Sequence, residues 1–99
     1  MTKKIDLQVN GNPIVLDYFV QSFVHHTTRG MIESLENVEP IKHLILTVKG
    51  DDVEIRLNGK PVSANKFVSR ITKSTISGMV APLKGVSAPL SSAKIEIEE

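Results

Sequence analysis

Two nine-residue stretches of the chain decide the fold class. They are Ile5-Asp6-Leu7-Gln8-Val9-Asn10-Gly11-Asn12-Pro13 and Val53-Glu54-Ile55-Arg56-Leu57-Asn58-Gly59-Lys60-Pro61. Each stretch begins with five residues that alternate apolar and polar, the pattern of a strand with one buried face. An Asn-Gly pair follows, and both of its residues tolerate the positive φ of a tight turn. The proline that comes next has no N–H to donate, so any returning arm is confined to a sheet edge.

The two stretches belong to a longer internal repeat. Residues 5–38 align with residues 53–86 at an offset of 48 without a gap, and ten of the 34 aligned pairs are identical. One inserted residue restores the register at the end, which sets the repeats at 5–48 and 53–98. Two units are too few for a solenoid, so we expect residues 1–99 to form a single domain in which the units cover each other. The identical pairs are Asn10/Asn58, Gly11/Gly59, Pro13/Pro61, Phe19/Phe67, Val20/Val68, Thr27/Thr75, Gly30/Gly78, Met31/Met79, Leu35/Leu83 and Val38/Val86.

A helix is predicted after each turn. Asp17 and Asn65 are residue types that cap a helix by accepting a backbone N–H of its first turn. Each mid-helix glycine, Gly30 and Gly78, costs about 1 kcal/mol relative to alanine, which indicates that another element approaches there. Apolar residues recur at helical spacing and predict one buried face per helix. The expected faces are Phe19, Val20, Phe23, Val24, Thr27, Gly30, Met31 and Leu35, and then Phe67, Val68, Ile71, Thr75, Gly78, Met79 and Leu83.

The segments Leu44–Val48 and Ala93–Glu98 complete the two units as strands. With right-handed crossovers, the order βαββαβ predicts an α+β, ferredoxin-like split sandwich, in which two helices cover one face of a four-stranded antiparallel sheet. In that strand order Leu44–Val48 and Ala93–Glu98 are the two edges. An alternative counts the arms after the Asn-Gly turns as strands and gives two ββαβ units that share one sheet.

Composition excludes several classes of function. Hydrophobic residues make up 40% of the chain and charged residues 23%, as in globular proteins, and the net charge of +1 is too small for a strongly basic nucleic-acid binder. The absence of cysteine excludes disulfides, thiolate nucleophiles and iron–sulfur clusters. The N-terminal residues do not resemble a signal peptide, and no apolar run approaches the roughly 20 residues that cross a membrane. We therefore expect a cytoplasmic protein that makes no membrane contact.

No combination of residues in the sequence identifies a reaction. His25 and His26 would point about 100° apart on a helix, so they are poorly placed to share a metal ion. His43 has no evident carboxylate partner. Ser22 and His26 lie four residues apart, within reach of each other, but they read as part of an exposed polar stripe. We expect no catalytic residue, no metal and no cofactor within one chain, which favours a protein that is not an enzyme. The alternative that stays open is a small enzyme whose catalytic groups converge between protomers on assembly.

Two surfaces are candidates for binding a partner. Lys66, Arg70 and Lys73 fall at i, i+4 and i+7 of the second predicted helix, and this basic stripe could contact phosphates or an acidic protein. It supports a weak, sequence-tolerant nucleic-acid binder as the alternative function.

Self-association is the leading expectation. Ile45 and Thr47 point outward on the expected edge strand Leu44–Val48, which carries no charge to discourage edge-to-edge pairing. Ile32, Ile76 and Val80 are further apolar residues just outside the expected buried helix faces. The sequence therefore predicts a homodimeric, non-enzymatic interaction module that uses this edge, the helix flank, or both.

Overall fold

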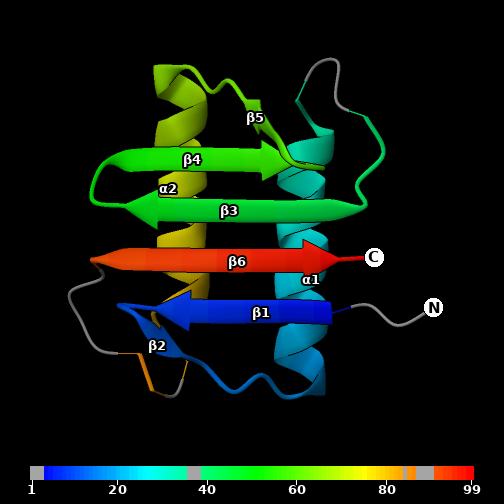
Figure 1. Cartoon of the computed structure of the whole chain (residues 1–99). Helices are drawn as coiled ribbons and strands as arrows, with labels where there is room; N and C mark the ends of the chain where they lie inside the picture. Colours follow the sequence, from blue (N-terminus) through cyan, green and yellow to red (C-terminus); the bar gives the residue numbers. More distant parts are fainter. Residues whose placement is uncertain (1–3, 36–38, 84, 87–90) are drawn as a thin grey trace.

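The computed structural model describes residues 4–35, 39–83, 85–86 and 91–99. These residues form an α+β structure with one antiparallel six-stranded sheet and two helices that lie on the same face of it (Figure 1). The strand order in the sheet is β2-β1-β6-β3-β4-β5. The elements are β1 (Lys4–Val9), β2 (Asn12–Pro13), α1 (Tyr18–Glu33), β3 (His43–Lys49), β4 (Asp52–Leu57), β5 (Lys60–Val62), α2 (Lys66–Val80) and β6 (Ser92–Glu98).

The strand order differs from the ferredoxin-like expectation. Strands β3 and β6, which we expected at the edges, are the two central strands and pair with each other. The arms after the Asn-Gly turns do form strands: β2 pairs with β1 and β5 pairs with β4, so these short arms occupy the edges. The expectation of a free edge at Leu44–Val48 was therefore wrong. Both sides of β3 are hydrogen-bonded, to β4 and to β6.

The core is built from rows of side chains that run across the four long strands. Leu7 pairs with Ile95, Ile95 with Leu46, and Leu46 with Ile55, so one row crosses the whole sheet on the side of the helices. All four side chains are almost completely buried. Burying a side chain of this size stabilises the fold by about 1.5–3 kcal/mol, so these rows are the main source of stability.

The helices bury only part of the face that their spacing predicted: Val24 is fully buried, and Val20, Met31 and Met79 pack against the core. Figure 1 shows both helices crossing behind the strands from one edge of the sheet towards the other, in opposite directions. A helix that crosses strands in this way touches the sheet along one narrow stripe. That stripe is Val24, Thr28 and Ile32 in α1 and Thr72, Ile76 and Val80 in α2.

Two sets of predictions for individual residues were wrong because the helices face the sheet with this stripe. Phe19, Phe23, Phe67 and Ile71 were expected in the core, yet they are 70, 49, 68 and 50% exposed. Ile32, Ile76 and Val80 were expected beside the buried faces as dimer contacts, but they pack in the core and cannot form a contact surface. Each helix carries two apolar stripes, and helical periodicity does not tell which of the two faces the sheet.

The Asn-Gly turns also fasten neighbouring strands. Asn10 and Asn58 both adopt the left-handed conformation, with φ of 52°. The Asn58 side-chain oxygen accepts hydrogen bonds from the backbone N–H groups of Lys42 and His43, at 3.0 and 2.9 Å. The Asn10 side-chain oxygen accepts from the backbone of Ser91 and Ser92, at 2.7 and 3.1 Å. Each turn therefore fixes the start of a central strand, and that strand comes from the other half of the chain.

The two mid-helix glycines do not mark a close approach. Both are exposed, and a Cβ atom added to Gly30 or Gly78 would meet nothing within 4 Å in the described structure. The overpacking that we expected from their supposed burial is therefore absent.

We predict that Gly30→Ala raises the free energy of unfolding by about 1 kcal/mol, and that Gly78→Ala does the same, because alanine is the better helix former and there is room for its methyl group. Urea unfolding at low protein concentration measures this. Gly11→Ala is the control: at φ +81° an alanine is strained and should destabilise the protein. A lower stability for Gly30→Ala would mean that this helix face is covered within one molecule.

Candidate interaction surfaces

Large apolar side chains project from the outer side of both helices. We call Phe19, Phe23, Phe67 and Ile71 the outer helix surface. Phe19 and Phe23 lie against each other, with ring centroids 5.9 Å apart. In the 48-residue repeat Phe19 aligns with Phe67, and Phe23 aligns with Ile71. Because the helices run in opposite directions and each pair lies near the N-terminal end of its helix, the two pairs form separate patches at opposite ends of the helix layer. An exposed apolar patch on a small domain marks a contact surface more often than a solvated one.

The helix caps fix where each helix begins and therefore where this surface begins. The Asp17 carboxylate accepts a hydrogen bond from the Val20 N–H at 2.8 Å, and the Asn65 side chain accepts one from the Val68 N–H at 2.8 Å. These contacts confirm the predicted caps and put a phenylalanine in the first turn of each helix. Counted from that phenylalanine as position i, the stripe continues with Phe or Ile at i+4, Thr at i+8 and Gly at i+11 in each helix. The outer stripe of each helix is therefore bulky at its N-terminal end and flat towards its C-terminal end.

The opposite face of the sheet is polar. Ile45 and Thr47 are half-buried there in the central strand β3, with Arg56 and Glu54 beside them on β4 and Glu96 and Lys94 beside them on β6. Because β3 is paired on both sides, Ile45 and Thr47 cannot support dimerisation through a strand edge. They could be reached only through the helix-free face.

The basic stripe of α2 lies beside acidic groups that the linear sequence did not reveal. Lys66, Arg70 and Lys73 line a cavity of about 660 Å³ together with Asp51 and Asp52 of the β3–β4 turn. The Lys73 ammonium forms an ion pair with the Asp51 carboxylate, and this hydrogen bond and charge lower the pKa of Asp51. Among the described residues, no carboxylate pairs with Lys66 or Arg70. Two of the three cations therefore remain available for a phosphate.

His25 is buried in the structure. It is only 3% exposed, and its Nε2 lies 2.7 Å from the Glu99 carboxylate. Arg29 donates from Nη1 to the same carboxylate at 2.6 Å. Burial on its own raises the pKa of Glu99, but the hydrogen bond from His25 and the charge of Arg29 outweigh it and leave that pKa below its usual value. The cluster attaches the residue after β6 to α1, and its members lie too far apart in sequence to be found by spacing.

The other two histidines also have hydrogen-bonding partners. His26 Nδ1 lies 2.9 Å from the backbone carbonyl of Ser22 and 3.4 Å from its hydroxyl, so this nitrogen donates to the carbonyl and does not act as a base towards Ser22. His43 does have a carboxylate partner, because its Nε2 lies 2.7 Å from Glu96.

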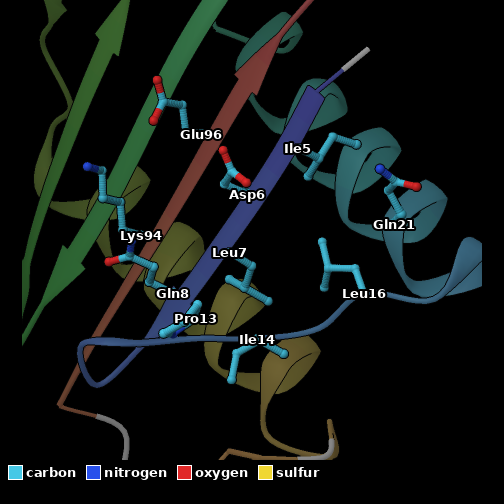
Figure 2. Close-up of a pocket in the computed structure, with 10 residues that line it drawn as sticks. All are labelled: Ile5, Asp6, Leu7, Gln8, Pro13, Ile14, Leu16, Gln21, Lys94 and Glu96. Atoms are coloured by element: carbon cyan, nitrogen blue, oxygen red, sulfur yellow. The ribbon is translucent and has the colours of Figure 1, made fainter. Parts of the chain in front are cut away.

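A second cavity, of about 270 Å³, lies along β1. Figure 2 shows that its polar and apolar lining residues lie on different sides of the strand: Asp6, Gln8, Lys94 and Glu96 on one side, and Ile5, Leu7 and Leu16 towards α1. The polar groups therefore do not converge with Gln21 of α1 on one point, as reacting groups would have to.

Comparison with known proteins identifies no relative: no protein-family model, no curated protein and no solved structure matches the chain. In the part of the chain that the structure describes, neither helix is long and apolar enough to cross a membrane.

We predict that Glu99→Gln lowers the free energy of unfolding at pH 7 by about 1–2 kcal/mol, because a charged hydrogen-bond acceptor is lost from a largely buried site. Since the folded pKa of Glu99 is lowered, its contribution is fully present above the unfolded value of about 4.3 and is lost as the pH falls through the folded value. The variant should therefore lose less stability than the parent between pH 5 and pH 3. Urea unfolding across this range tests the prediction.

Glu33→Gln is the matched control, because Glu33 also contacts Arg29 but is exposed, and exposed ion pairs contribute little. Equal acid sensitivity of the parent and Glu99→Gln would show that the cluster does not contribute to stability.

Proposed function

We propose that this chain is a non-enzymatic interaction module that binds a second copy of itself through the outer helix surface. The observation that carries the proposal is the exposure of Phe19, Phe23, Phe67 and Ile71 at equivalent positions of two adjacent helices. Exposed aromatic and aliphatic groups of this size are typical of the centre of an interface.

The dimensions of the molecule support a second copy as the occupant. The structure is a slab with extents of 35 × 35 × 18 Å, so each broad face is large compared with the thickness. A stable interface buries about 800 Å² on each partner. One broad face can supply that area, and the helix face is the apolar one.

The arrangement of the two stripes also favours self-association. The helices run in opposite directions, and each is bulky at its N-terminal end and small at Gly30 or Gly78. If α1 packs antiparallel on the α1 of a second copy, the phenylalanine end of each helix meets the glycine end of the other. Such a contact is two-fold symmetric and closes on itself. It also accounts for Gly30, which packs against no other element among the described residues.

Part of the repeat identity lies on this surface. We infer that the two ββαβ halves descend from one duplicated unit, because they share their element order, their Asn-Gly turns and their helix caps. Three of the identical pairs, Phe19/Phe67, Thr27/Thr75 and Gly30/Gly78, lie on the outer stripes of the helices. Other identical pairs include residues that are half-buried against the core, namely Val20, Met31, Leu35, Met79 and Leu83.

We predict that the parent is a dimer at high micromolar concentration and that the double variant Phe19→Ser with Phe67→Ser is a monomer. Light scattering coupled to size exclusion measures both. At low concentration the double variant should unfold at nearly the parent temperature, since the substituted side chains are already exposed in one molecule.

Val15→Ser is the control, because Val15 is an exposed apolar residue that lies outside both helices. A monomeric parent, or a double variant that is as dimeric as the parent, would overturn the proposal. Dimerisation lost equally in Val15→Ser would place the contact elsewhere on the molecule.

A weak nucleic-acid binder remains the second candidate, supported by the exposure of Lys66 and Arg70 beside an open cavity. With Lys73 engaged by Asp51, two phosphate contacts are expected, and the logarithm of affinity for a duplex should fall against the logarithm of salt with a slope of about −2.

Lys66→Ser with Arg70→Ser should abolish this binding, whereas Lys73→Ser should leave the slope almost unchanged. A salt titration with fluorescent duplex and single-stranded probes measures the effect. If neither probe binds at low ionic strength, the nucleic-acid function is excluded.

A further inference from the structure

Three side chains that can ligate metals come together on the helix-free face of the sheet. His43 is the first residue of β3, and Glu96 and Glu98 lie on the neighbouring strand β6. In the register of these strands His43 is opposite Glu98, and Glu96 is two residues further along β6, so all three side chains point to the same face. His43 Nε2 lies 2.7 Å from a Glu96 oxygen and 4.0 Å from a Glu98 oxygen.

We propose that His43, Glu96 and Glu98 bind a divalent transition-metal ion of the zinc type. One imidazole nitrogen and two carboxylates form a ligand set that suits such ions, and three protein ligands leave a fourth position for water. Ligands about 2.0–2.1 Å from a tetrahedral ion are separated from each other by about 3.3 Å. The distances from His43 bracket this value, and all three ligand atoms lie within 4.8 Å of one another. Small side-chain rotations would therefore complete the site.

The backbone that carries these ligands is held rigidly. Both strands are central and are paired on each side. The His43 N–H donates to the Asn58 side chain at 2.9 Å, and the His43 carbonyl accepts from the Asn58 N–H at 2.7 Å. On β6, the N–H of Glu99 donates to the Lys42 carbonyl at 2.9 Å, which fixes the residue after Glu98. Ligands on fixed strands lose little conformational entropy when an ion binds.

The cluster occurs in one half of the chain only. At the positions related to His43, Glu96 and Glu98 by the restored register of the repeat, the other half has Ser92, Thr47 and Lys49. The equivalent position in the other half of the chain therefore lacks the three ligands and serves as an internal comparison.

Zinc and cobalt ions are the probes for the test, added to the tag-free chain. We expect calorimetry to show one Zn²⁺ ion bound per chain with micromolar affinity, and Co²⁺ to give visible absorption bands of a site with nitrogen and oxygen ligands. His43→Ala should weaken Zn²⁺ binding at least tenfold. His26→Ala is the matched control and should bind like the parent, because His26 is an exposed histidine on α1.

Glu98→Gln keeps the proposal testable if His43→Ala unfolds. The Glu98 side chain is exposed and 4.0 Å from His43, so this variant should retain the parent melting temperature but bind Zn²⁺ at least tenfold more weakly. No binding by the parent at hundreds of micromolar Zn²⁺ would overturn the proposal, and so would equal weakening in His26→Ala. The monomeric variant Phe19→Ser with Phe67→Ser should still bind the ion, so the outcome is independent of self-association.

Discussion

The pairing of β3 with β6 holds the two halves of the molecule together. Each strand belongs to a different half, and each inserts beside the first strand of the other half, so that β6 lies next to β1 and β3 lies next to β4. The apolar rows of the core cross this seam, and Leu46 opposite Ile95 lies at its centre. The Asn10 and Asn58 turns fix the entry of these strands, which makes the sheet continuous from edge to edge. Neither half could bury its apolar face without the strand that the other half supplies.

The direction of the helices gives the two broad faces different chemistry. Because α1 and α2 cross the strands, each packs one stripe of side chains on the core and leaves the stripe that begins at Phe19 or Phe67 outside. The helix face is therefore apolar and suited to another protein surface, while the sheet face is polar and carries the His43 cluster. Since the two faces are separated by the thickness of the sheet, self-association and ion binding need not compete.

Local structure could be predicted from the sequence, because it depends on neighbouring residues. The strands, the Asn-Gly turns and the caps at Asp17 and Asn65 all form where the pattern indicates. The neighbours of each strand could not be predicted, because alternation defines the faces of a strand and not its partners. The buried helix face could be predicted only in part: Val24 is buried as expected, but the stripe that begins at Phe19 has the same helical spacing and is exposed. His25 with Glu99 and His43 with Glu96 are joined only by the tertiary fold, across 74 and 53 residues.

The central position of β6 has a consequence for how the chain folds. The β3–β4 hairpin pairs residues that are close in sequence. The pairing of β1 with β6, in contrast, joins residues as far apart as Ile5 and Ile97, which are separated by 92 positions. Non-local pairing of this kind raises contact order and slows folding. Until β6 arrives, β1 and β3 each expose an unpaired edge beside an uncovered apolar face, which is the type of intermediate that aggregates or exchanges strands between molecules. A complete sheet therefore requires β6 to enter at its centre, between β1 and β3, rather than at its rim.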